Sequence, residues 1–136
     1  NYFIGIGQIK DWKIRYNIFK NLKKLRVNTP KIISSNAIVS NESIVGEGTI
    51  IMNGSIINSG AKIGENCIIN TGTIIEHDAV ISNHCHIAPG CIINGNVIIG
   101  EKTFVGSGTI INNNIKVNKN NVIPSGSLIH KNILKN

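Results

Sequence analysis

A six-residue repeat runs without interruption from Ile32 to His130 and constrains the fold more than any other feature of this chain. The second residue of every block is Ile or Val, and the residue four positions later is mostly small. A block of six is too short for a helix-turn-helix unit, but it suits one short strand followed by a corner. Both positions must therefore point into one shared interior. The aliphatic positions of the seventeen blocks are Ile33, Val39, Val45, Ile51, Ile57, Ile63, Ile69, Ile75, Ile81, Ile87, Ile93, Ile99, Val105, Ile111, Val117, Ile123 and Ile129.

With three blocks per turn, each coil has eighteen residues and stacks its Ile side chains over those of the coil below. The 99 residues of the repeat then predict an all-β protein, a parallel β-helix of about five and a half coils. At the usual spacing of roughly 4.8 Å between strands, the prism would be about 26 Å long. Gly and Asn gather at the expected corners, as in Asn53-Gly54, Asn94-Gly95 and Asn113-Asn114, because corners often require a positive φ.

Residues 1–31 predict a separate unit ahead of the β-helix. Residues 2–6 predict a short strand, and residues 11–26 predict an amphipathic helix. Pro30 marks the break before the first coil. Such a unit cannot bury its own apolar face, so we expect it to pack on structure upstream of Asn1 or on a neighbouring chain. The apolar side of the predicted helix consists of Trp12, Ile14, Ile18, Phe19, Leu22 and Leu25.

We therefore expect three segments: a strand-helix unit over 1–31, a β-helix over 32–130 and a C-terminal tail over 131–136. The formal net charge of +7 belongs to the first of them, because 1–31 holds eight basic residues and one acidic residue, whereas 32–136 holds six of each. A short basic helix beside a neutral body is typical of a solvated helical face, and no aromatic platform for bases accompanies it. No apolar run approaches the roughly 18 residues of a membrane span. The sequence predicts a cytoplasmic protein that binds neither nucleic acid nor membrane.

His77 is the most informative polar residue of the repeat. It occupies an outward position between Glu76 and Asp78, and acyl transfer needs a base near neutral pH, which an imidazole beside a carboxylate supplies. The three cysteines, by contrast, all fall on the small interior position of their blocks, so burial explains them without chemistry. They form no CxxC pair, and we expect no metal.

Three segments, 69–78 (INTGTIIEHD), 86–90 (HIAPG) and 95–97 (GNV), resemble the bacterial sugar acetyltransferase branch of the hexapeptide-repeat acyltransferases. That branch includes sialic acid O-acetyltransferases and UDP-4-amino-sugar N-acetyltransferases. The resemblance implies a left-handed coil, acetyl-CoA as co-substrate, and a homotrimer with active sites between adjacent prisms. It also implies that residues 1–31 are the remnant of an α/β nucleotide-sugar domain.

Matched by motif, the resemblance implies catalytic roles for His77 and Asp78 and an acetyl-CoA-binding role for Gly95. His77 corresponds to the general base, and Asp78 corresponds to the acid that raises its basicity. Gly95 corresponds to a backbone donor to the thioester carbonyl. Gly95 follows His77 by eighteen residues, so one coil of about 4.8 Å would separate the two on the same face.

The resemblance implies binding roles for four more residues. Asn70 corresponds to a polar residue at the acceptor site, and His86 corresponds to a residue that contacts substrate or acetyl-CoA. Ser107 and Ser125, also eighteen residues apart, correspond to positions along which the family threads the pantetheine arm.

We therefore expect an acetyl-CoA-dependent acetyltransferase that acts on a sugar or a nucleotide-linked amino sugar in cell-surface glycan biosynthesis. N- and O-acetylation stay open, and a sialic acid O-acetyltransferase is the alternative. A zinc enzyme like the γ-class carbonic anhydrases is more distant, because His77, His84 and His86 fall within ten residues, whereas that class separates its ligands by tens. A non-catalytic β-helix binding module would need a repeated Thr ladder, but Thr71 stacks under Pro89.

Overall fold

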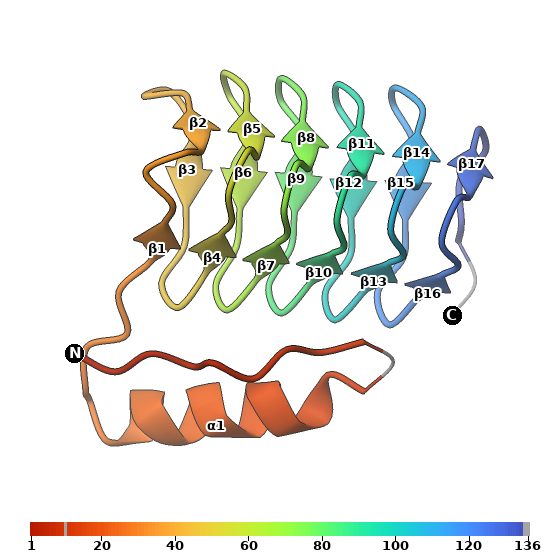
Figure 1. Cartoon of the computed structure of the whole chain (residues 1–136). Helices are drawn as coiled ribbons and strands as arrows, with labels where there is room; N and C mark the ends of the chain where they lie inside the picture. Colours follow the sequence, from red (N-terminus) through yellow and green to blue (C-terminus); the bar gives the residue numbers. More distant parts are fainter. Residues whose placement is uncertain (10, 135–136) are drawn as a thin grey trace.

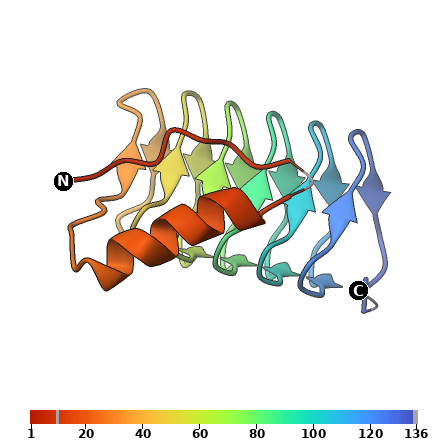
Figure 2. The same cartoon turned by 90° about the horizontal axis from the view of Figure 1, so that it is seen from below.

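The computed structural model describes residues 1–9 and 11–134, and its main body is a triangular prism built from two-residue strands. Each strand pairs in parallel with the strand eighteen residues further along the chain, so three flat sheets form the sides of the prism. Figures 1 and 2 show the prism from two directions, with one helix and an extended segment beneath it. The predicted parallel left-handed β-helix is confirmed.

We call the three sides sheets A, B and C. Sheet A contains β1 (Ile32–Ile33), β4 (Ile50–Ile51), β7 (Ile68–Ile69), β10 (His86–Ile87), β13 (Phe104–Val105) and β16 (Val122–Ile123). Sheet B contains β2 (Ile38–Val39), β5 (Ile56–Ile57), β8 (Ile74–Ile75), β11 (Ile92–Ile93), β14 (Ile110–Ile111) and β17 (Leu128–Ile129). Sheet C contains β3 (Ile44–Val45), β6 (Lys62–Ile63), β9 (Val80–Ile81), β12 (Ile98–Ile99) and β15 (Lys116–Val117).

The predicted C-terminal tail continues the last coil. Ile133 bridges to Val117 in parallel, so residues 131–134 extend sheet C at its end. Residues 135 and 136 lie outside the described residues.

The interior of the prism is a stack of aliphatic side chains, one from the second residue of each strand. From Ile51 to Ile123 every member of this column is at most 2% exposed, which confirms the inward prediction. Burying one such side chain contributes roughly 1.5 to 3 kcal/mol. Cys85 and Cys91 also lie inside, as predicted, and burial raises the pKa of both thiols. They stay protonated at neutral pH.

The corners share one backbone conformation, in which a residue with positive φ recurs every six residues from Gly48 to Gly126. Gly54 and Asn114 have this conformation, as their sequence pairs predict. At the pair Asn94-Gly95, however, the positive φ falls on Asn96 instead. The local turn therefore does not require a glycine at position 95, and the reason for Gly95 must lie in its neighbours on other coils.

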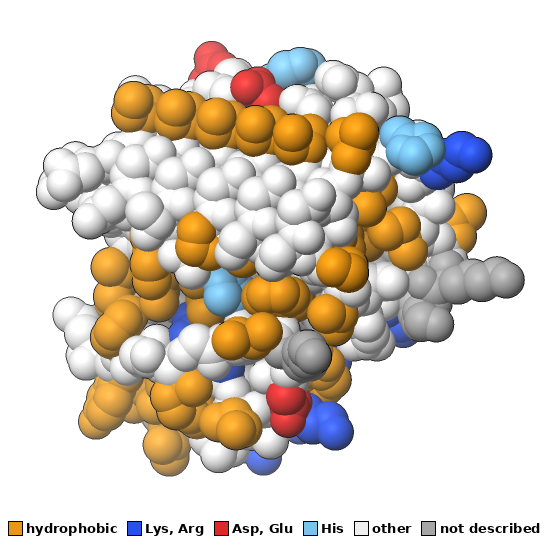
Figure 3. Space-filling model, turned by 45° about the vertical axis from the view of Figure 1, so that its right-hand side comes forward, with side chains coloured by type: hydrophobic (Ala, Val, Ile, Leu, Met, Phe, Trp, Pro, Cys, Tyr) orange, Lys and Arg blue, Asp and Glu red, His pale blue; other side chains and the backbone are white. Residues whose placement is uncertain are grey.

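The outer surface of sheet B carries a continuous row of aliphatic side chains, one from each strand. Its members are in register, and those at its two ends, Ile38 and Leu128, are 67% and 61% exposed. Figure 3 shows the row as an apolar band along the prism. The six residues of this sheet B row are Ile38, Ile56, Ile74, Ile92, Ile110 and Leu128.

The strand predicted over residues 2–6 is wrong. This segment extends along the prism axis beneath sheet A (Figure 1). Its Tyr2 amide donates to the carbonyl of Asn28, after the helix (2.9 Å), and its Ile4 and Ile6 carbonyls accept from the Arg15 side chain. Because the segment crosses the strands and does not lie beside an edge strand, no ladder of hydrogen bonds forms. The predicted helix is present but shorter, as α1 (Lys13–Lys24). None of the helical structure in residues 1–9 and 11–134 has the length and apolar character that a membrane crossing requires.

Helix α1 packs on the prism of its own chain, and its buried face differs from the predicted one. Phe19 is buried over Gly48, but Ile14 and Leu25 are 59% and 71% exposed. Arg15, not predicted to be inside, is 1% exposed. Backbone carbonyls explain this burial, because the Arg15 guanidinium donates to Ile4 (2.7 Å), Ile6 (2.8 Å) and Gly48 (3.1 Å).

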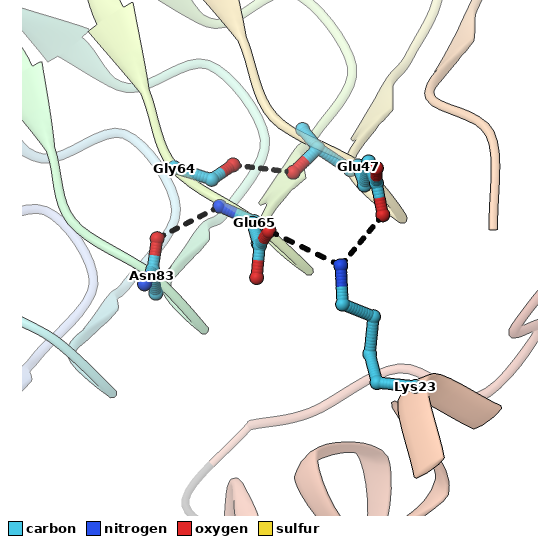
Figure 4. Close-up of polar contacts among 6 residues, drawn as sticks. Lys23, Glu47, Gly64, Glu65 and Asn83 are labelled. Atoms are coloured by element: carbon cyan, nitrogen blue, oxygen red, sulfur yellow. Dashed lines mark hydrogen bonds and ion pairs between the residues drawn. The ribbon is translucent and has the colours of Figure 1, made fainter. Parts of the chain in front are cut away.

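Desolvation by burial lowers the pKa of Arg15 to about 10, which still leaves the guanidinium charged at neutral pH. The other end of α1 is held by a surface contact, in which Lys23 Nζ lies 2.7 Å from Glu47 and 3.4 Å from Glu65 (Figure 4). These groups are exposed, and exposed ion pairs contribute little to stability. Arg15 is therefore the main polar anchor of the N-terminal unit.

Replacing Arg15 with Met should release this unit from the prism. Met fills much of the volume but leaves three carbonyls without their donor, each at a cost of about 1 to 3 kcal/mol when buried, so we expect a loss of about 3 kcal/mol. Urea unfolding followed by the fluorescence of Trp12, the single tryptophan, measures it directly. Lys24→Met, on the exposed side of α1, is the control and should change little. Equal stability of Arg15→Met and the native chain would contradict the anchor.

Candidate active site

His77 lies in the corner where sheet B turns toward sheet C, directly after β8. Its Nδ1 is 3.0 Å from Asp78 Oδ2, and the two side chains are 56% and 61% exposed, in agreement with the outward position. A carboxylate oxygen can only accept, so Nδ1 carries the proton of the neutral ring and Nε2 keeps its lone pair. The backbone helps to place the carboxylate, because Asp78 has a φ of 59° and its amide donates to the Ser59 carbonyl (3.1 Å).

Gly95 lies directly beside the His77 ring on the next coil. A Cβ atom at this position would be 2.6 Å from His77 Nε2 and 2.7 Å from Cε1, closer than real side chains approach. Within the described part of the chain, no carbonyl accepts the Gly95 amide hydrogen. The predicted proximity is thus present: a basic nitrogen and an uncommitted backbone amide share one small region of the surface.

Asn70 and His86 lie near a different edge, where sheet A turns toward sheet B. Asn70 Nδ2 is 3.2 Å from His86 Nε2, and His86 Nδ1 donates to the backbone carbonyl of Gln8. The His86 ring is only 7% exposed and packs edge-on against Phe104 at 5.2 Å. Burial lowers the pKa of His86, so its ring is neutral at pH 7. A direct contact of His86 with a ligand stays a prediction, while Asn70 is partly exposed.

Ser107 and Ser125 are exposed in the corner column that follows Asn70, and the Gly126 amide donates to the Ser107 carbonyl (2.8 Å). The predicted site residues therefore divide into two groups on a single prism. His77, Asp78 and Gly95 form the B–C edge group. Asn70, His86, Ser107 and Ser125 form the A–B edge group.

The sheet B row lies between these two groups, and sequence reasoning missed it. The signal was available, because the first residue of every third block is Ile or Leu, but only the inward second positions were interpreted. An apolar face between two polar edges suits contact with another protein surface.

The geometry does not favour a metal centre. His77 lies at the B–C edge and His86 on sheet A, while His84 is 9% exposed at the third edge, against the Tyr16 ring at 4.9 Å. Among residues 1–9 and 11–134, no three His, Cys, Asp or Glu side chains gather closely enough to hold an ion. The Thr ladder of a binding face is interrupted as well, since Pro89 takes the place of Thr71 on the next coil, where the Gly90 amide donates to the Thr71 carbonyl (2.9 Å).

Comparison with known proteins gives one family and several solved structures. The model for bacterial transferase hexapeptide (six repeats) matches residues 42–77, 60–95 and 78–113. No curated protein sequence gives a significant match.

Among solved structures, the chain is similar to the acetyltransferase domain of PglB from Neisseria gonorrhoeae in complex with acetyl coenzyme A, at 28% identity and a TM-score of 0.89 over 92% of this chain and 61% of that one. It is similar to PerB from Caulobacter crescentus in complex with CoA and GDP-perosamine, at 26% identity and a TM-score of 0.89 over 96% and 62%. WeeI from Acinetobacter baumannii matches at 26% identity and a TM-score of 0.70 over 88% and 64%. The chain thus spans less than two thirds of the length of each.

Replacing Gly95 with Ala should displace the His77 ring while the prism stays folded. The added Cβ overlaps the imidazole, but φ at Gly95 is not positive, so the backbone accepts Ala. We expect the ring resonances of His77 to shift in NMR spectra. The matched control is Gly72→Ala, where φ is +66° and no atom lies within 4 Å. That variant should lower the melting temperature and leave His77 unmoved. Unchanged His77 resonances in Gly95→Ala would refute the contact.

Proposed function

The chain belongs to the bacterial transferase hexapeptide family, and from this premise we propose that it transfers the acetyl group of acetyl-CoA to a nucleotide-linked amino sugar. The observation that carries the proposal is the His77 ring, which lies against Gly95 with Nδ1 on Asp78. Support for the substrates comes from the similar structures, of which one holds acetyl coenzyme A and another holds CoA with GDP-perosamine. Acetyl-CoA chemistry also agrees with the predicted cytoplasmic location.

In the proposed reaction, His77 Nε2 removes a proton from the acceptor amine as its nitrogen attacks the thioester carbonyl. Asp78 keeps the ring oriented and stabilises the imidazolium that forms. The Gly95 amide donates to the carbonyl oxygen while that oxygen carries negative charge. The C–N bond forms, the C–S bond breaks, and the imidazolium returns its proton to the departing thiolate. A general base and an oxyanion donor each contribute about 10²-fold or more.

N-acetylation is our preferred form of this proposal, because a similar structure at 26% identity is named a perosamine N-acetyltransferase. The same base can also activate a hydroxyl group, so a sialic acid O-acetyltransferase stays the alternative. Paired assays with amino and hydroxy sugars distinguish them.

The proposal includes a homotrimer, as the two edge groups lie on opposite sides of the sheet B row. Three parallel prisms whose B faces point toward a common axis would bury this row. The A–B edge of one copy would then meet the B–C edge of the next. Asn70, Ser107 and Ser125 of one copy would thereby face His77 of its neighbour, with acetyl-CoA along the serines and the acceptor near Asn70 and His86.

The decisive experiment measures acetyl-CoA-dependent release of CoA thiol with a nucleotide-linked amino sugar. The native chain should turn over, and His77→Ala should lower kcat by two orders of magnitude or more, with its melting temperature nearly unchanged because the side chain points outward. Acetyl-CoA should raise the melting temperature as its occupancy rises, and free acetate should not.

His130→Ala is the matched control, since His130 is also exposed but lies in the last coil, away from Gly95. It should retain full activity. Unfolding of His77→Ala, with activity per folded molecule intact, would assign His77 a structural role only and overturn the proposal.

The trimer has its own test in the sheet B row. Ile74→Asp combined with Ile92→Asp places two carboxylates in the proposed interface, so light scattering should report a monomer where the native chain gives a trimer. Ile98→Asp is the control, because Ile98 is a 43% exposed Ile on the outer face of sheet C and should leave the trimer intact. A native monomer at micromolar concentration, or a trimer that survives both substitutions, would contradict this arrangement.

A further inference from the structure

A chain of hydrogen bonds connects the N-terminal segment to the A–B edge group through His86. Gln8 and His86 are 78 residues apart in sequence, yet the Gln8 carbonyl accepts from His86 Nδ1. On the other side of the ring, Asn70 Nδ2 lies 3.2 Å from Nε2. Gln8 and His86 are 4% and 7% exposed, so water hardly reaches the hydrogen bond between them.

The Gln8 carbonyl determines which atom donates and which accepts in each hydrogen bond of this series. A carbonyl oxygen only accepts, so the proton of the neutral ring is on Nδ1, and Nε2 must accept from the Asn70 amide nitrogen. The amide oxygen of Asn70 supports the same orientation, because Asn70 Oδ1 accepts from the Thr71 backbone N–H (2.8 Å). One Nδ2 hydrogen of Asn70 is thus directed at His86. The second Nδ2 hydrogen belongs to a partly exposed side chain and is not used by the bonds to His86 and Thr71.

At the Gln8 end of this series of hydrogen bonds, further contacts fix the backbone in place. The Gln8 side chain donates to the His84 carbonyl (2.7 Å), and the preceding residues Ile4 and Ile6 are fixed by Arg15. The carbonyl that orients His86 therefore belongs to a docked segment and not to a loose end.

We propose that His86 is a positioning residue, which holds the Asn70 amide so that one N–H points at an oxygen of the acceptor, and that the N-terminal segment is thereby part of the acceptor site. This inference rests on the proposed function, because the acceptor role of Asn70 does. In this proposal His86 does not contact the ligand directly but acts on it through Asn70.

Protonation of His86 would break this arrangement. Nε2 would then carry a hydrogen facing the Asn70 Nδ2 hydrogens, so the amide would have to flip and lose its bond with Thr71. The groups packed around the ring are Gln8, Asn70 and Phe104, with the positive charge of Arg15 near it. Desolvation by burial lowers the pKa of His86, the Gln8 carbonyl raises it, and Arg15 lowers it further. The net lowering keeps the ring neutral at pH values where an exposed histidine is already protonated.

The first test needs no enzymatic activity. Long-range ¹H–¹⁵N NMR spectra of the native protein should show His86 with a protonated Nδ1 and an unprotonated Nε2. On lowering the pH, this tautomer should persist below the ordinary titration midpoint of histidine, because burial lowers the pKa of His86. A protonated Nε2 in the neutral ring, or titration of His86 at or above the ordinary midpoint of histidine, would overturn the proposal.

The second test is a double-mutant cycle in the acetyltransferase assay. His86→Leu and Asn70→Ala should each raise KM for the acceptor about tenfold, the loss expected for one hydrogen bond, and leave KM for acetyl-CoA unchanged. The combined variant should be no worse than either one, because both remove the same contact. His86→Gln, which keeps an oxygen acceptor for Asn70, should restore most of the loss.

Phe104→Leu is the matched control, since it alters packing on the His86 ring without changing a hydrogen bond, and it should leave KM for the acceptor near the native value. Additive losses in the cycle, or equal losses in His86→Gln and His86→Leu, would refute the positioning role. If the native protein transferred no acetyl group at all, the proposed function would be refuted instead. The NMR experiment would then test the hydrogen bonds around His86 independently of activity.

Discussion

The in-register stacking of coils eighteen residues long is the constraint on which the rest of this structure depends. Each strand pairs with the equivalent residues of the next coil, as in Ile74 with Ile92 and Ile75 with Ile93. Residues at the same place in successive coils therefore meet at the spacing of paired strands, about 4.8 Å. The Asp78 carboxylate lies over Gly60 and the His77 ring against Gly95 for this reason. One inserted residue would turn every later inward Ile toward solvent.

The same geometry explains why the candidate site is divided. A filled prism has convex edges and flat faces, so no single copy can surround a ligand with side chains from two edges. A groove of about 370 Å³ does lie on sheet C beside Lys62 and Asn83, but neither His77 nor Gly95 lines it. In the proposed trimer, concave space for two substrates would come from the meeting of prisms, with burial of the apolar sheet B row as the driving force.

The N-terminal unit adds a different kind of order to the repeat. It is joined to the prism by contacts that no period generates: the buried Arg15 guanidinium, the Phe19 ring over Gly48, and the Gln8 contacts with His84 and His86. A buried cation is costly unless its donors are satisfied, and here three carbonyls satisfy most of them. The unit thereby covers part of sheet A and reaches the A–B edge group.

The sequence by itself determined the features that follow from the six-residue repeat. The inward aliphatic column, the three-sided coil and the proximity of His77 to Gly95 all follow from spacings of six and eighteen residues, because each coil repeats the pairing of the one before. Only the tertiary structure decided which face of α1 is buried, that residues 2–6 form no strand, and that His86 lies under Gln8. These features depend on the docking of segments far apart in the chain. Their energies come from burial and hydrogen bonds between surfaces that no local pattern of residues encodes.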